Sequence, residues 1–517
     1  MDTVQDHLII LRDGKFDTAN GTSPQTMDNM FANLRTELPK KIVINFHGGL
    51  VDRPSGIAAA TALNPDYETA GAHPLFFIWE SGWREVLEQK LPNIFQEEIF
   101  KNILTRVTQF AKAKVDKATE TGTSMGIDDL PLPKETPIRT ELKVPSDGQE
   151  PFAGVDPSVI PESDQLTNEE RKMFIERMKN DTSLEVIGQR VANSVQTPEA
   201  EAGLGTAKAA TIRGASETLM DPDVLREITS TGDIEKGEAK SVFSAASLAA
   251  RAAVVLERVI SRFARRRDHG FYLTIVEEIL RGFYVGNAGK FMWDGMKSDI
   301  VDAFGFAADC GGAQFLAGLE KVWNDPVWNS TAKPALTLVG HSAGAIYACN
   351  FLREVEARKL PADVKFNVIL IAPACTFRVL ADTLKAAGNR VDALRVFGMD
   401  DERERKNALV PAVPLLYPSS LLYFVSGILE DESDTPLVGM ARFWEGIYTS
   451  GKFPEIDYVV NGAFFKPKTS RIWALSSGGN GLNCDMSTHG GWAEAPETLK
   501  SVLYILSKGY GDGAAAG

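Results

Sequence analysis

One serine lies at the centre of the segment 340–344 (Gly-His-Ser-Ala-Gly), with a glycine two residues to either side. The apolar run 336–339 before this segment is typical of a buried strand, and the run 345–352 after it is typical of a helix. On so tight a turn a side chain at either glycine would collide with neighbouring elements, and the turn would push the serine oxygen outwards. The spacing predicts that the Ser342 hydroxyl can attack a carbonyl carbon once a base has taken its proton. The alternative is an ordinary glycine-rich turn.

This order of strand, G-x-S-x-G turn and helix resembles the nucleophile elbow of the α/β-hydrolase family, which includes serine esterases and lipases. The resemblance implies that Ser342 is the nucleophile of a Ser-His-Asp triad that forms an acyl-enzyme intermediate. It also implies that the acid, and then the histidine, follow the serine along the chain.

Histidine is scarce, with six residues in the chain, and only His489 lies beyond the serine. It stands in the small-residue loop 487–491, between a run typical of a strand (471–475) and a run typical of a helix (496–506). A histidine between the last strand and the last helix matches the family order, so the resemblance assigns His489 as the base. The competing interpretation is a solvated loop histidine. His341 is interpreted as structural, with its side chain directed away from the reacting centre.

The acid is expected after a strand that lies between the serine and the histidine. Two runs are strand-like, 366–372 and 393–399, and the second is followed by the acids Asp400, Asp401 and Glu402. The G-x-x-D spacing that ends at Asp401 resembles the acid turn of the family, which makes Asp401 the first candidate and Asp400 the alternative. The acid would hold the imidazole tautomer and stabilise the imidazolium. The competing interpretation is that this charged run is a solvated loop.

A strand-like run at 41–46 opens into the sequence His-Gly-Gly-Leu, which resembles the HG-type loop after an early strand of the family. Glycine lets backbone N–H groups turn towards a developing oxyanion, where one preorganised donor lowers the barrier by roughly 3–4 kcal/mol. The resemblance implies that the N–H groups of Gly49 and Ala343 form the oxyanion hole. Gly48 and Leu50 are the alternatives to Gly49, and a plain turn is the competing interpretation.

Short apolar runs alternate with segments of helical period at both ends of the chain. Besides those already named, strands are expected at 7–11 and 75–79, and a helix at 27–38. Near-continuous apolar runs of this kind favour a mostly parallel sheet with helices on both faces. They predict an α/β class, and the resemblance carried by the motifs implies an α/β-hydrolase fold for residues 1–84 and 290–517.

Residues 85–289 form a large insertion where a simple hydrolase would have one helix, and we expect it to be mainly helical. Its expected helices are 86–118 (interrupted at Pro92), 168–195 and, as the longest, 238–266. The stretch 128–165 is rich in proline and acids, which predicts a linker or irregular surface loop with few apolar side chains to bury. The insertion is interpreted as a lid or cap over the active site, as an assembly surface for a homo-oligomer, or as elaboration without a separate role.

The last of these helices carries arginines at its end, Arg262, Arg265, Arg266 and Arg267. Such a cluster can bind phosphate or lipid headgroups, but a solvated helix end favoured by the helix dipole is the preferred interpretation. Charged residues interrupt the apolar part of the helix, so no transmembrane segment is expected.

Composition excludes several classes of protein. A net charge of −14 and a pI near 5.1 argue against nucleic acid as a partner. The four cysteines are too few and too scattered for a disulfide framework. The sequence holds no metal-ligand cluster, and we expect no cofactor. The first residues lack the basic segment and apolar core of a signal peptide, which predicts a cytoplasmic location.

Two functions from different classes remain. The first is a serine hydrolase that cleaves an ester, a thioester or a lipid acyl bond, with a small-molecule or lipid acyl substrate. The second is a catalytically degenerate hydrolase scaffold that acts as an interaction module. The elbow, the late histidine, the acid turn and the glycine loop all occur in the family order, which favours the enzyme.

Overall fold

Eight strands form one sheet in the order β10-β9-β8-β7-β3-β4-β1-β2. All neighbouring strands are parallel except the edge pair β1 and β2. The strands are β1 (Leu8–Arg12), β2 (Lys15–Phe16), β3 (Lys41–Phe46), β4 (His73–Trp79), β7 (Ala335–His341), β8 (Phe366–Ile371), β9 (Val391–Gly398) and β10 (Arg471–Trp473). The computed structural model describes residues 4–19, 21–49, 51–79, 84–121, 132–142, 150–194, 218–231, 241–284, 288–330, 333–411 and 414–510.

The central strands are buried on both sides, which explains their near-continuous apolar sequences. The predicted α/β class, with a mostly parallel sheet between helices, is confirmed. β2 was not expected from the sequence pattern, because a two-residue edge strand leaves no periodic signal.

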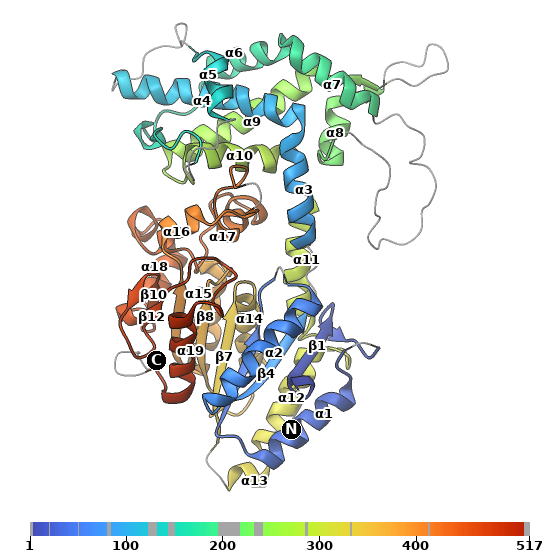
Figure 1. Ribbon diagram of the computed structural model, residues 1–517, viewed down its shortest axis with the longest axis vertical. Helices are drawn as coiled ribbons and strands as arrows, with labels where there is room; N and C mark the ends of the chain where they lie inside the picture. Colours follow the sequence, from blue (N-terminus) through green and yellow to red (C-terminus); the bar gives the residue numbers. More distant parts are fainter. Residues whose placement is uncertain are drawn as a thin grey trace.

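Helices cover both faces of the sheet (Figure 1). Outside the insertion, the helices of the described chain are α1 (Pro24–Glu37), α2 (Arg53–Thr69), α11 (Ala288–Asp302), α12 (Gly311–Trp323), α13 (Pro326–Asn329), α14 (Gly344–Ala357), α15 (Phe377–Ala387), α16 (Asp401–Lys406), α17 (Leu421–Phe424), α18 (Pro454–Val460) and α19 (Pro496–Lys508). Aromatic side chains fill the layer between the sheet and α14. Phe46 stacks on Tyr347 with ring centroids 4.8 Å apart, and Phe77 lies 5.1 Å from Phe46. This packing fixes the helix that follows Ser342 against β3 and β4.

The inserted segment forms a helical layer at one end of the molecule, reached through α3 and left through α11 (Figure 1). Its elements are α3 (Arg84–Gln96), α4 (Glu98–Thr121), α5 (Glu135–Glu141), α6 (Asn168–Lys179), α7 (Thr182–Ser194), α8 (Pro222–Ile228), α9 (Ala245–Ala264), α10 (Phe271–Phe283) and the short strands β5 (Thr229–Thr231) and β6 (Ser241–Phe243). The longest-helix prediction was wrong, since α4 has 24 residues and α9 has 20. Pro92 lies inside α3, and the break between helices comes at Glu97. The Glu97 carboxylate accepts hydrogen bonds from Thr218 at 2.8 Å and Tyr284 at 3.0 Å.

The proline-rich stretch 128–165 is only partly described, and its described parts are packed. Residues 135–141 form α5, and Pro157–Val159 is a short 3-10 turn. Ile138, Phe152 and Ile160 are buried in the core of the helical layer. For these parts the expectation of a linker with little to bury was wrong, because these few apolar side chains are enough to dock the chain onto α4 and α9. Residues 128–131 and 143–149 lie outside the described part.

Buried charges join the insertion to the C-terminal part of the chain. Arg262 is ion-paired with Glu277 at 2.8 Å and with Glu278 at 3.1 Å. His269 is fully buried between two carboxylates, Nδ1 at 2.8 Å from Glu277 and Nε2 at 3.1 Å from Asp434. The interpretation of the arginine cluster as a solvated helix end is therefore wrong for Arg262, although Arg265 and Arg266 are exposed.

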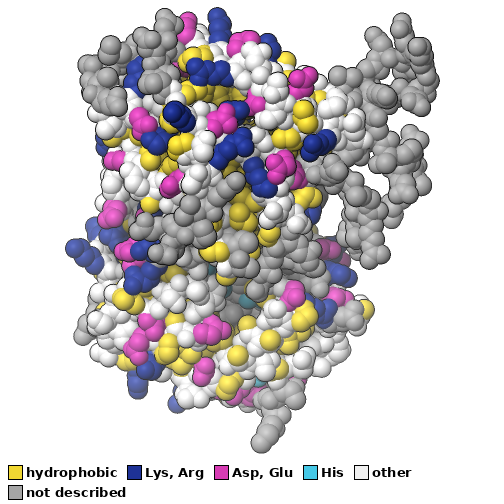
Figure 2. Space-filling view, turned by 45° about the horizontal axis from the view of Figure 1, so that its top comes forward, with side chains coloured by type: hydrophobic (Ala, Val, Ile, Leu, Met, Phe, Trp, Pro, Cys, Tyr) yellow, Lys and Arg dark blue, Asp and Glu magenta, His cyan; other side chains and the backbone are white. Residues whose placement is uncertain are grey.

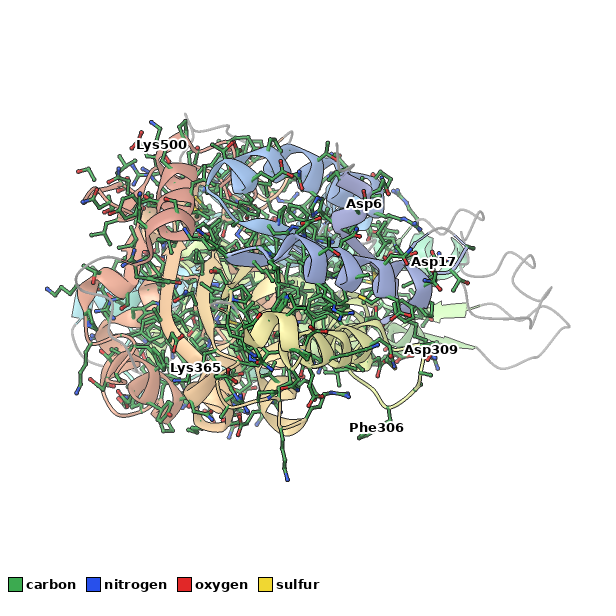
Figure 3. All side chains as sticks on the ribbon, turned by 90° about the horizontal axis from the view of Figure 1, so that it is seen from below. Asp6, Asp17, Phe306, Asp309, Lys365 and Lys500 are labelled. Atoms are coloured by element: carbon green, nitrogen blue, oxygen red, sulfur yellow. The ribbon has the colours of Figure 1, made fainter. Side chains whose placement is uncertain are left out.

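The remaining surface carries charges of both signs. Figure 2 shows Lys, Arg, Asp and Glu side chains interspersed over the helical end. Near the other end, Phe306 projects from the loop between α11 and α12, fully exposed (Figure 3). Among the described helices, none combines the length and apolar character needed to cross a bilayer. The four cysteines are buried and free.

Candidate active site

Ser342 stands on the turn between β7 and α14 in a left-handed backbone conformation, with a φ of 53°. This region is costly for a residue other than glycine and persists only where the surroundings enforce it. A Cβ at Gly340 would lie 2.7 Å from the Gly344 oxygen, and a Cβ at Gly344 would collide with the Phe46 carbonyl of β3. The predicted collisions of side chains at both glycines are confirmed.

Backbone hydrogen bonds pin this turn to the end of β8. The Ser342 N–H donates to the Ile371 carbonyl at 2.9 Å, and the Ser342 carbonyl accepts from the Ala374 N–H at 2.9 Å. The serine is 3% exposed. Hydrogen bonds to the end of β8 thus hold the strained turn in place, and the Ser342 side chain faces a cavity rather than open solvent.

His489 lies against the serine. Its Nε2 is 2.9 Å from the Ser342 Oγ, and the ring is 7% exposed. Burial and, to a smaller extent, neighbouring His341 lower the pKa of His489 to about 3, so the imidazole is neutral at pH 7. A neutral imidazole at this distance can accept the serine proton. Nδ1 is buried, and within the described part of the chain it has no hydrogen-bond partner.

Activity is expected to persist in acid solution, because the base works only while its imidazole is neutral. With a pKa near 3, kcat/KM should stay level from pH 8 down to about pH 5, whereas an unperturbed histidine would halve it near pH 6.5. A pH profile of ester hydrolysis measures this. A half-maximal point near pH 6.5 in folded protein would contradict it.

Folding must be followed in the same experiment. Burial also lowers the pKa of His47 and of His341 to about 4. The folded state binds protons at these two imidazoles less readily than the unfolded chain does. The folded protein is therefore most stable above pH 6.5, and its free energy of unfolding decreases as the pH falls towards 4. The melting temperature at each pH separates this loss from protonation of His489.

The structure does not bring the predicted acids to His489. Asp401 accepts a hydrogen bond from the Tyr423 hydroxyl at 2.6 Å and another from Arg405 Nε at 3.2 Å. Asp400 caps α16 by accepting from the Arg403 N–H at 2.8 Å. Glu402 is exposed and bonds to Lys406 at 2.6 Å.

The physical reason is that the acidic run starts a helix. An aspartate followed by acids in the first turn, with basic residues three and four positions on, satisfies helix capping and pairing. This signal was present in the sequence between residues 400 and 406. It differs from the solvated loop considered there and from an acid turn aimed at the histidine.

Because Asp401 bonds to Tyr423 and Arg405 and not to His489, Asp401→Asn is expected to lower kcat/KM by no more than about tenfold. Loss of a triad acid that orients the histidine would lower the rate by roughly 10⁴-fold. The two bonds of Asp401 lie within the C-terminal part, so the main effect should be on stability. Steady-state kinetics with a short ester, beside Asp400→Asn as the matched control, decides this. A loss of a thousandfold in Asp401→Asn alone would show that this carboxylate reaches His489 during turnover.

The glycine loop after β3 lies against the serine turn. A Cβ at Gly49 would be 2.8 Å from the Ala343 Cβ, and a Cβ at Gly48 would be 3.4 Å from the Ser342 Cβ. Among the described residues, no backbone carbonyl accepts a hydrogen bond from the N–H of Gly49 or Ala343. Within the described part of the chain, these two N–H groups thus lack a backbone acceptor, and both belong to segments that contact each other beside the serine, as an oxyanion hole needs. Leu50 lies outside the described residues.

His47 holds this loop, a role that the sequence interpretation missed. Its Nδ1 donates to the Gly48 carbonyl at 2.7 Å, and its Nε2 accepts from the Trp79 N–H at 3.1 Å. The ring stacks on the Trp79 indole with centroids 4.0 Å apart. The order of histidine before two glycines was the available signal.

His341 differs from its sequence interpretation. Its Nε2 donates to the His489 carbonyl at 3.0 Å, so this side chain lies beside the base rather than away from it. Asn407, which the sequence did not single out, accepts from the His489 N–H at 3.0 Å.

A cavity of about 480 Å³ opens at Ser342 and His489. Its walls are mostly apolar. Among the described residues that line it, Glu494 is the only aspartate, glutamate, lysine or arginine. Apolar side chains come from α2 and β4, from Leu87 of α3, from the segment after α16 and from the loop after His489; they include Ala59, Leu63, Phe76, Ile78, Leu409, Leu421 and Trp492. The site can hold an apolar group next to the serine hydroxyl.

Comparison of the chain with protein-family models, with curated proteins and with solved structures finds no match. The chemistry of the site therefore rests on its own geometry.

Proposed function

We propose that this protein is a serine hydrolase with an α/β-hydrolase-type fold, which cleaves an ester, thioester or lipid acyl bond. The observation that carries the proposal is the 2.9 Å contact between Ser342 Oγ and His489 Nε2 on a turn with a positive serine φ. Backbone strain of this kind persists only where the surrounding structure enforces it, and it is concentrated at functional sites. A serine beside a neutral imidazole has the two groups that an activated nucleophile needs.

The reaction follows from these positions. His489 Nε2 takes the Ser342 proton while Oγ attacks the carbonyl carbon of the substrate. The negative oxygen of the tetrahedral intermediate meets the N–H groups of Gly49 and Ala343. His489 then gives the proton to the leaving oxygen or sulfur, which leaves an acyl group on Ser342. Water, activated by the same imidazole, releases the acid and restores the serine.

The cavity favours an apolar acyl group. Its described lining has no lysine or arginine, and its single acid would repel an anionic substrate. A volume of about 480 Å³ falls within the range of small-molecule sites. Leu87 is the only described residue of 85–289 in this lining, so a lid role for the insertion stays a prediction, as does assembly through it.

The second candidate function, an interaction module on a degenerate hydrolase scaffold, is favoured by one observation. No described acid reaches Nδ1 of His489. The enzyme remains preferred, because Ser342, His489 and Gly49 all line one cavity and the serine oxygen lies within hydrogen-bond distance of the imidazole.

Labelling with a fluorophosphonate probe tests the proposal. The probe phosphonylates a serine whose proton a neighbouring base can remove, and mass spectrometry of the digest locates the adduct. Modification of Ser342 supports the hydrolase. Absence of any adduct on folded protein, with no turnover of short esters, would favour the interaction module.

A further inference from the structure

Among the described residues, no acid orients the imidazole of His489 by a bond to its ring. Nδ1 of His489 is buried, and no described side chain bonds to it. Two glycines follow His489, and a Cβ at Gly490 would meet nothing within 4 Å. A loop of this composition has little stiffness of its own. Within the described part of the chain, contacts other than a carboxylate on the ring must therefore keep Nε2 at 2.9 Å from Ser342 Oγ.

The main chain of His489 is held on both sides by side chains. Its N–H donates to Asn407 Oδ1 at 3.0 Å, and its carbonyl accepts from His341 Nε2 at 3.0 Å. Each of these partners comes from a different element of the fold. Together they hold the two peptide units that flank the His489 Cα, one through its N–H and the other through its carbonyl.

His341 can play this part in only one tautomer. Because a carbonyl oxygen only accepts, the hydrogen must be on Nε2, and Nδ1 is then unprotonated. A Cβ at Gly48 would lie 3.1 Å from this Nδ1, so the ring also packs on the oxyanion loop. Burial lowers the pKa of His341 to about 4, which keeps it neutral at pH 7. One side chain thereby touches the base and the loop of the oxyanion donors.

The places of both residues in the chain make the arrangement informative. His341 immediately precedes the nucleophile in the chain. Its hydrogen bond to the His489 carbonyl therefore ties the base to the nucleophile through a single peptide bond. Asn407 directly follows α16, beyond the strand end where the acid was expected. The segment that fails to bring an acid to the ring thus brings an amide oxygen to the backbone.

We infer that His341 and Asn407 are positioning residues, which orient His489 through its main chain in place of an acid bound to its ring. The inference rests on the proposed function, and it adds two residues to the working site. A shift of about 1 Å in a reacting group can cost about a hundredfold in rate. Loss of either contact is therefore expected to lower kcat by about 10- to 100-fold, with KM nearly unchanged.

Paired substitutions separate this role from a merely structural one. His341→Gln keeps an N–H donor of similar reach, and His341→Met has a similar shape without the donor. Asn407→Asp keeps the acceptor oxygen, and Asn407→Leu removes it. The measurements are kcat and KM with a short ester, the rate of fluorophosphonate labelling, and the melting temperature.

The Met and Leu variants are expected to lose 10- to 100-fold in kcat and in labelling rate. The Gln and Asp variants are expected to stay within about threefold of wild type. If Gln is as slow as Met and Asp as slow as Leu, hydrogen bonding is not what matters and the inference is overturned. It is also overturned if all four variants melt earlier but keep the wild-type kcat.

Labelling of the unaltered protein distinguishes the two levels of failure. If the wild type labels at Ser342 and the variants all retain kcat, the hydrolase stands and only the positioning role is lost. If the wild type does not label or turn over esters, the proposed function fails, and the positioning role fails with it.

Discussion

Ser342→Ala is expected to abolish covalent labelling by a fluorophosphonate and to lower ester hydrolysis by roughly 10⁴–10⁶-fold. Alanine keeps the same Cβ as serine, so the backbone strain at a φ of 53° is unchanged and the turn should fold as before. Only the hydroxyl beside His489 Nε2 is removed. Probe labelling, steady-state kinetics and the melting temperature measure the three parts of this expectation.

His489→Ala is the partner experiment. Nucleophile and base act as a unit, so this change alone should cost nearly as much as Ser342→Ala, and the double variant should be little worse than either. If labelling persists at full strength in Ser342→Ala, another residue carries the reaction. If the two losses multiply, the 2.9 Å contact does not reflect a shared step.

Gly344→Ala is expected to have the largest effect on stability. The added Cβ would meet the carbonyl of Phe46, the last residue of β3, which is paired with β4 and β7 and cannot rotate away as a side chain could. The turn or β3 must then shift, at a cost of about 3 kcal/mol or more. Because Ser342 moves with the turn, activity should also fall by at least about a hundredfold. Chemical denaturation and ester kinetics measure both losses.

A glycine close to the same site provides the control. A Cβ at Gly490 would meet nothing within 4 Å, so Gly490→Ala should stay within about 0.5 kcal/mol of wild type. Equal stabilities for the two variants would contradict the packing described for the turn.

The elements that position the serine could be predicted because local pattern and tertiary environment agree. The runs at 41–46 and 366–372 are apolar because β3 and β8 are buried on both faces, and their bounds are matched within one residue. The two glycines around Ser342 report on crowding that the turn itself creates. The packing of 150–165 onto the helical layer could not be predicted, because it depends on Phe152 and Ile160 finding partners far away in the chain.

The site was predictable to a different depth for each residue. His489 could be singled out because histidine is scarce and the order along the chain leaves one candidate. The acid could not, because an aspartate at the end of a strand serves equally as a helix cap, which is what Asp400 does. His341 and Asn407 act on the backbone of a residue more than 80 positions away, and no periodicity or spacing marks such a contact.

The contacts of Asp434 determine whether the helical insertion can be separated from the rest of the protein. Its buried carboxylate contacts two residues of the insertion that precede α10, Arg267 and His269. It also contacts two residues of the C-terminal part of the chain, Arg442 and Tyr448. Cutting out residues 85–289 would strip half of the partners from a charge with no access to water, and breaking a buried ion pair costs about 3–5 kcal/mol. The helical layer is therefore no detachable module. It should melt together with the sheet in one cooperative transition, and it should not survive transplantation to another scaffold.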